Sequence, residues 1–191
     1  MSTTRQRRTS GRLPTQDEVH PDLVGADSLD KKVARYALAA ARLSLGWIFL
    51  WAFLDKTFGL GHETAHADAW IRGGSPTKGF LAFGAAGPFT DLYHSIAGDA
   101  WADWLFMLGL LGIGLALTLG IGMRFAAVAG ALLYVLMWSV VLPPVNNPVI
   151  DEHILGAISV VVLALFHAGD TWGLGRRWTK LHLVQRFPVL R

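Results

Sequence analysis

The feature that most constrains this chain is a stretch of 69 residues, 101–169, that carries only four charged side chains. A stretch of that length with average composition carries about 17. Over all 191 residues the chain is 16% charged and 52% hydrophobic, whereas soluble domains are about 25% charged. So small a soluble protein has too much surface to cover with so few charges. We therefore expect an integral membrane protein.

Four apolar segments are long enough, or nearly so, to cross the hydrocarbon core of a bilayer as helices, which takes about 20 residues. They run over residues 36–54, 104–122, 125–142 and 149–169. Residues 55–103 form a long, glycine-rich loop with short apolar pieces, which we interpret as short interfacial helices or as a loop that only caps the bundle. The expected fold is all-α, an integral membrane four-helix bundle with a long outer loop.

Lys and Arg are concentrated at the two ends of the chain, with seven in residues 1–35 and five in residues 176–191. Cytoplasmic flanks of membrane proteins carry such an excess, so both termini are expected in the cytoplasm. The expected organisation is a disordered basic arm over 1–35, a membrane domain over 36–178 and a basic tail over 179–191. These basic ends indicate membrane orientation rather than nucleic-acid binding.

One charged residue lies deep in the first apolar segment. Arg42 is about 10 Å inside the cytoplasmic end of that segment at 1.5 Å per residue. A charge at such a depth needs a partner inside the protein, and His167 or Asp170 near the end of the fourth segment would supply one. The alternative interpretation is a purely structural contact.

Polar residues also flank the outer ends of the first and fourth segments. We expect Asp55 and Lys56 to meet Glu152 and His153 there and to form a site. The competing interpretations are that Lys56 extends to the interface and that Asp151, with Glu152, only complements the positive end of the fourth helix.

Residues 62–66 match the zinc-binding pattern H-E-x-x-H, whose two histidines share a helix face. The pattern lies in a glycine-rich loop, and the extended form would need a glycine and a histidine where Ala69 and Arg72 stand. We therefore assign no metal site to His62, Glu63 and His66, with a structural metal ion there as the less favoured alternative.

The sequence limits the redox chemistry that this chain can support. It has no cysteine and no haem, flavin or iron–sulfur motif, so electrons would pass to a lipid-soluble carrier such as a quinone, or to a partner. His153 or a neighbouring carboxylate could exchange the protons that quinone reduction consumes. Aromatic side chains could line an apolar slot for the ring: Trp47, Phe49, Trp51, Phe53, Tyr134 and Trp138.

Several strings resemble the DoxX/DoxD family of bacterial and archaeal membrane proteins. The first segment contributes 42–49 followed by Asp55-Lys56, and the outer loop contributes 70–81 and 87–89. Residues 103–110, 147–153 and 169–178 resemble that family's second helix, its asparagine-proline, acidic-acidic-histidine segment and its closing motif. The resemblance covers about residues 36–178 and implies a four-helix protein of the prokaryotic plasma membrane.

The DoxD branch is associated with thiosulfate:quinone oxidoreductase, which joins two thiosulfates into tetrathionate and passes electrons to quinone. The resemblance implies a second subunit; further copies of this chain are the other partner considered. We expect Glu152 and His153, with Asp151, to handle protons, and Lys56 with Arg72 or Lys78 to attract a small anion. Arg42 and Asp55 complete the predicted binding set. The alternatives are a non-catalytic membrane scaffold of an oxidative-stress or respiratory complex and, less well supported, a small-solute transporter or channel.

Overall fold

The computed structural model describes the backbone of residues 21–190 and side chains from Ser28 onward. No residue in that range lies in a β-strand, so the expectation of an all-α fold is confirmed there. The chain divides into two units, Met1–Ala34 and Arg35–Arg191. All packing and sites below belong to the second unit.

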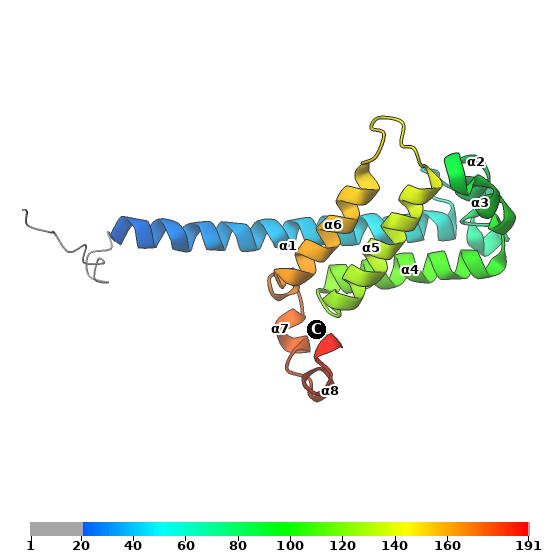
Figure 1. The fold of residues 1–191 in the computed structure, drawn as a ribbon. Coiled ribbons are helices and arrows are strands. Elements are labelled where there is room, and N and C mark those ends of the chain that lie inside the picture. The colour runs from blue at the N-terminus through cyan, green and yellow to red at the C-terminus, as the bar shows by residue number, and fades with distance from the viewer. Residues whose placement is uncertain (1–20, 191) are drawn as a thin grey trace, which may run out of the picture. The chain divides into compact units, whose positions relative to one another are not determined.

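Eight α-helices follow one another in the described chain (Figure 1), with short 3₁₀ turns between them. The α-helices are α1 (Pro21–Phe58), α2 (Lys78–Phe83), α3 (Thr90–Ile96), α4 (Ala100–Leu119), α5 (Met123–Val140), α6 (Glu152–Leu165), α7 (Gly175–Trp178) and α8 (His182–Arg186). The 3₁₀ turns are η2 (His66–Asp68), η3 (Trp70–Arg72), η4 (Gly87–Phe89), η5 (Ala168–Asp170) and η6 (Pro188–Leu190).

Three of these helices are long and apolar enough to cross a membrane: Ser28–Phe58 within α1, α4 and α5. The fourth apolar helix, α6, has 14 residues, which is about 21 Å against about 30 Å of hydrocarbon. The predicted limits of 149–169 are therefore wrong at both ends. Asp151 caps the helix at its start, and His167, just past its end, has a left-handed backbone with φ of 51°.

The core forms where α1, α4, α5 and α6 pack together. Helices α1 and α4 run antiparallel beside each other (Figure 1), with Gly46 against Thr118 and Gly114 against Leu50. Helix α5 packs against both α4 and α6. Buried side chains from all four helices fill the space between them: Phe49, Met107, Leu110, Ile113, Leu117, Met123, Ala126, Val160 and Leu163.

The loop over 55–103 folds into η2, η3, α2, η4 and α3. It has a small core of its own, in which Leu81 and Tyr93 pack against Val140 at the end of α5. The loop therefore contains short helices and is attached to the end of the bundle. Their position at a membrane surface stays a prediction.

Both terminal segments contain helical structure where the structure describes them. Helix α1 begins at Pro21, so residues 21–35 are helical in the structure where the sequence led us to expect a disordered arm, and residues 1–20 lie outside the described chain. Proline suits the first position of a helix, and extending an existing helix avoids the cost of nucleation. In the tail, Trp178 Nε1 donates to Leu190 O at 2.6 Å and Val184 is fully buried.

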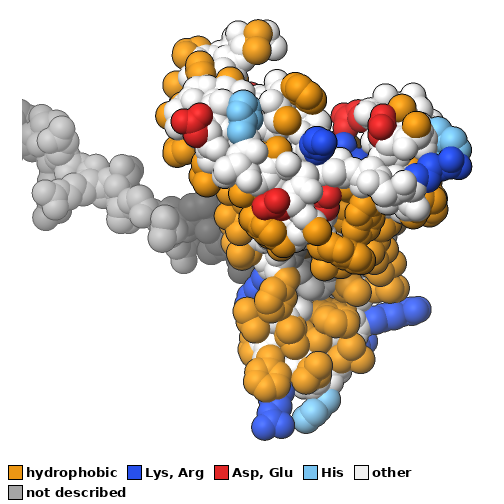
Figure 2. All heavy atoms as spheres, turned by 90° about the vertical axis from the view of Figure 1, so that its right-hand side faces the viewer, with side chains coloured by type: hydrophobic (Ala, Val, Ile, Leu, Met, Phe, Trp, Pro, Cys, Tyr) orange, Lys and Arg blue, Asp and Glu red, His pale blue; other side chains and the backbone are white. Residues whose placement is uncertain are grey.

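The distribution of side chains fits a membrane environment. On the face shown in Figure 2, charged side chains and histidines gather over the upper part and again at the lower tip. Mostly hydrophobic side chains cover the surface between them. Such an extensive exposed apolar surface fits contact with lipid.

Candidate functional site

A cavity of about 750 Å³, which we call the apolar cavity, lies at the end of the bundle where α1 ends and α6 begins. Helices α1 to α6 all contribute to its wall. Most of the lining is hydrophobic: Pro76, Phe80, Leu81, Leu92, Tyr93, Ile96, Trp101, Ala102, Leu105, Phe106, Leu133, Leu136, Met137 and Val140. Small-molecule sites have this character, with a few polar groups that orient the ligand.

Four polar residues complete the lining of the apolar cavity: Lys56, Glu63, Thr77 and His153. Two of them, Lys56 from α1 and His153 from α6, belong to the predicted outer site. The structure therefore brings these two to one cavity from opposite ends of the sequence. None of the six aromatic residues proposed for a quinone slot lines it. Phe49 and Tyr134 instead pack ring against ring between α1 and α5.

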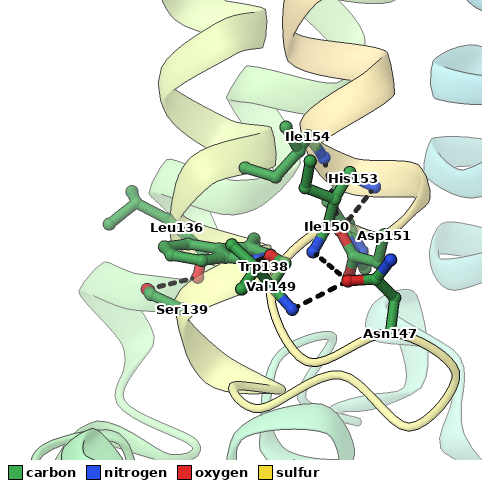
Figure 3. Close-up of polar contacts among 9 residues, drawn as sticks. All are labelled: Leu136, Trp138, Ser139, Asn147, Val149, Ile150, Asp151, His153 and Ile154. Carbon is green, nitrogen blue, oxygen red and sulfur yellow. Dashed lines mark hydrogen bonds and ion pairs between the residues drawn. The ribbon is translucent and has the colours of Figure 1, made fainter.

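His153 is held in place by Asp151, as Figure 3 shows. The ring Nδ1 lies 2.8 Å from Asp151 Oδ2, and since a carboxylate only accepts, Nδ1 carries the proton. No described residue hydrogen-bonds to Nε2. The free ring nitrogen is therefore the one available to a molecule in the cavity.

Asp151 also caps α6. Its Oδ1 accepts from the backbone N–H of His153 at 3.0 Å and of Ile154 at 3.3 Å. Burial by itself raises the pKa of this carboxyl. The hydrogen bonds from His153 and Ile154 and the attraction of the His153 ring lower the pKa by a larger amount. The net pKa of Asp151 lies below its ordinary value, so the carboxylate stays charged at neutral pH.

The turn before α6 fixes the position of Asp151. Asn147 Oδ1 accepts from the backbone N–H of Val149 at 2.9 Å and of Ile150 at 3.0 Å (Figure 3). Trp138 Nε1, from α5, donates to Val149 O at 2.8 Å. The asparagine-proline segment thus forms a hydrogen-bonded turn, and this turn places Asp151 and His153 at the start of α6.

Glu152 and Asp55 do not take the places predicted for them. Glu152 is exposed and lines no part of the apolar cavity, because adjacent helical residues point about 100° apart and His153 faces inward. Asp55 is only 2% exposed, but its carboxylate accepts the backbone N–H groups of His62, Glu63 and Thr64 at 2.9–3.3 Å. Chain reversal after α1 leaves those N–H groups needing an acceptor.

The H-E-x-x-H string does not form a helix. Gly59 has a φ of +65°, and a Cβ there would lie 2.7 Å from Ala65 O, so α1 ends and the chain turns back. The His62 ring packs on Trp51, while Glu63 contacts Lys56. No group of three potential metal ligands occurs in the described part of the chain.

A second pocket, which we call the polar pocket, has a volume of about 510 Å³ and adjoins the apolar cavity. Lys56 and Lys78 both line it, together with Glu63 and Asp68. Arg72 is exposed and lines neither pocket. Arg72 and Lys78 were predicted to join Lys56 at an anion site. Only Lys78 lies in the same pocket as Lys56. Lys56 and Glu63 line both pockets and stand between them.

Arg42 lies far from both pockets, in the interior of the bundle, and is fully buried. Its five N–H groups donate hydrogen bonds to five backbone carbonyls, those of Leu117, Thr118, Ala168, Thr171 and Trp172. The predicted pairing with His167 or Asp170 is wrong. The carbonyls at the end of α4 and in the turn after α6 have no helical partners, so they accept from the guanidinium instead.

Sequence reasoning missed a buried carboxylate beside the apolar cavity. Asp103, at 6% exposure on α4, accepts from Ser75 Oγ at 2.8 Å and from Thr77 Oγ1 and N at 2.6 and 3.0 Å. The sequence signal that could have identified this carboxylate is that Asp103 is the only acidic residue in the first turn of a long apolar helix. This contact fastens the loop to α4 and sets the position of Thr77 on the cavity wall.

Comparison of the chain with protein-family models finds no match, and comparisons with curated proteins and with solved structures find none either.

Proposed function

We propose that this chain is the membrane subunit of a quinone-linked oxidoreductase of the DoxX/DoxD type, acting on thiosulfate or a similar small anion. One observation carries the proposal. A large apolar cavity and a smaller polar pocket adjoin each other and share Lys56. The first suits a lipid-soluble ring. The second has Lys56 and Lys78 in its wall beside the carboxylates of Glu63 and Asp68, and a small anion would bind at the two lysines.

The overall reaction balances between these two pockets. Two thiosulfates lose one electron each and form the sulfur–sulfur bond of tetrathionate. One quinone takes up the two electrons together with two protons and becomes the quinol. No other oxidant or reductant is needed.

The residues of this chain would bind and orient the reactants and move protons. His153 presents Nε2 to the apolar cavity because Asp151 holds Nδ1, so it can exchange a proton with a quinone oxygen. Lys56 supplies positive charge to both pockets. In this proposal the pockets lie at the outer face of a prokaryotic plasma membrane, both termini are cytoplasmic, and a second subunit completes the enzyme.

Quinone reduction by thiosulfate, measured with the complex in purified membranes, tests this function. We expect H153Q to lower the rate at least tenfold, within the range for loss of a general acid or base. The exposed neighbour gives a matched control, because E152Q should leave the rate unchanged. Absence of activity in the intact complex, with no quinone co-purifying, would reject the proposal.

A scaffold function is the second candidate, and Arg42 favours it. This buried charge, like Asp55 and Asp103, is used in holding backbone or loop segments together. The same variants separate the candidates: a scaffold predicts that H153Q impairs folding or assembly, whereas an enzyme predicts loss of turnover in a folded complex.

A further inference from the structure

The ion pair between Lys56 and Glu63 stands at the boundary of the two pockets. Lys56 Nζ lies 3.5 Å from Glu63 Oε2, which is a loose contact, and the two side chains are 16% and 79% exposed. The lysine is thus largely enclosed by protein, while its partner carboxylate is free to turn into solvent. A loose pair with one partner in solvent is weak, worth about 1 kcal/mol or less.

The backbone of Glu63 is fixed even though its side chain is exposed. Its N–H donates to Asp55 Oδ2 at 3.1 Å, and the neighbouring Thr64 N–H donates to the same oxygen at 2.9 Å. The buried Asp55 carboxylate therefore anchors the turn over the end of α1. A carboxylate held on a short tether has a high effective concentration at its target, so Glu63 occupies Lys56 when nothing else does.

From this arrangement we infer that Glu63 is an internal competitor for the anion that binds in the polar pocket. The ligand is a small oxoanion that carries two negative charges and contacts Lys56 and Lys78, and it displaces the single charge of the Glu63 carboxylate. This inference rests on the proposed function for the identity of the physiological anion. The displacement itself concerns only the polar pocket and needs no quinone.

Substitution of Glu63 removes the competitor and one negative charge, so a matched charge control is needed. Asp68 provides it, because it lines the same pocket and forms no ion pair with any described residue. E63Q and D68N change the field in the pocket by the same charge, but only E63Q frees Lys56. Glu63 is 79% exposed, so the substitution leaves the fold intact.

Sulfate, which thiosulfate resembles but which donates no electrons, is the probe. Thermal unfolding of the full chain in lipid nanodiscs is titrated with sodium sulfate against sodium chloride at equal ionic strength, and the midpoint gives an apparent Kd. We expect E63Q to lower that Kd about two- to fivefold, the fold-change that an exposed ion pair is worth. D68N should change it by less than half as much, and K56M should abolish the stabilisation.

Two results would overturn the inference: equal effects of E63Q and D68N, which would indicate only a change of field, or no sulfate-specific stabilisation in wild type and E63Q alike. The outcome is separable from the proposed function. Tighter sulfate binding by E63Q without thiosulfate–quinone turnover in the complex would support the competitor and reject the oxidoreductase. Thiosulfate–quinone turnover in the complex, with a sulfate Kd that E63Q leaves unchanged, would support the oxidoreductase and reject the competitor.

Discussion

Arg42 shows how a full positive charge is held inside apolar helices without a counter-ion among the described residues. The guanidinium has five N–H donors in a fixed plane, and five carbonyls from two separate segments accept them. Two of the acceptors lie at the end of α4, where the helix dipole places partial negative charge. Arg42 therefore joins α1 to the ends of α4 and α6, and a lysine could not reach all five acceptors.

Asp151 allows its two contributions, capping and charge, to be measured apart. Asparagine caps a helix about as well as aspartate, whereas alanine loses about 1 kcal/mol as a cap. D151N should therefore keep the cap but remove the charge and, because an amide NH2 donor replaces Oδ2, the hydrogen bond from His153 Nδ1. D151A should remove the cap as well. We expect the thermal midpoint to fall in the order wild type, D151N, D151A at pH 7.

The lowered pKa of Asp151 predicts how the difference in thermal midpoint between wild type and D151N changes with pH. A carboxyl whose folded pKa lies below its unfolded value, about 3.9, stabilises the fold above that value. The contribution is lost as the pH falls through the folded pKa. The difference in thermal midpoint between wild type and D151N should thus shrink between pH 7 and pH 3. A difference that is constant over this range would contradict the argument.

The sequence identified single residues whose own chemistry demands a partner inside the protein. It did not identify which partner each of them would contact. Arg42 was recognised as a buried charge, but carbonyl acceptors exist at every position and leave no trace in a sequence. His153 was predicted as a site residue together with Glu152, whereas the exposure of Glu152 depends on which way the first turn of α6 faces. Asp103 looked like an ordinary first-turn acid, because its partners Ser75 and Thr77 lie 26–28 residues away.

At the scale of elements, the turn after α6 passes extremely close to the end of α4. A Cβ on Gly169 would lie 2.4 Å from Gly120 O, which is backbone and cannot give way. G169A should therefore separate the two segments and weaken the Arg42 contacts that depend on their approach. We expect a loss of at least about 2 kcal/mol of stability, in the range for overpacking, measured by thermal or denaturant unfolding in detergent.

Gly112 in the middle of α4 is the matched control. A Cβ there would meet nothing within 4 Å, and alanine is favoured over glycine in a helix interior by about 1 kcal/mol. G112A should be neutral or stabilising. Equal destabilisation by G112A and G169A would show that close approach is not the cause.

The helices themselves were the most predictable elements, because a long apolar run identifies a membrane-spanning helix. The confirmed part is that residues 21–190 are all-α and contain three such helices, α1, α4 and α5. The limits of α6 could not be read from hydropathy, since its start is set by the Asp151 side chain and its end by the turn that wraps Arg42. Apolar residues 149–150 and 166 continue the pattern outside the helix.

At the scale of the unit formed by Arg35–Arg191, the loop before α6 and the tail after it lie at opposite ends of α5 and α6 (Figure 1). Helix α6 is about 9 Å shorter than a typical hydrocarbon core. If α6 crosses the membrane, one of its ends lies below the lipid surface or the bilayer thins beside it. If in addition the tail lies at the cytoplasmic surface, the start of α6 with Asp151 and His153 faces the outer side, as the proposed function requires.

The absence of cysteine makes this topology directly testable, because a single introduced thiol is the only one in the chain. Val145, in the loop before α6, is fully exposed, and Gln185 is exposed on α8. With both termini cytoplasmic, V145C should react with a membrane-impermeant maleimide in intact spheroplasts, and Q185C only after lysis. V160C, at a fully buried position of α6, should stay unlabelled in both. Labelling of V145C and Q185C from the same side would show that α6 does not cross the membrane, and the opposite pattern would invert the orientation.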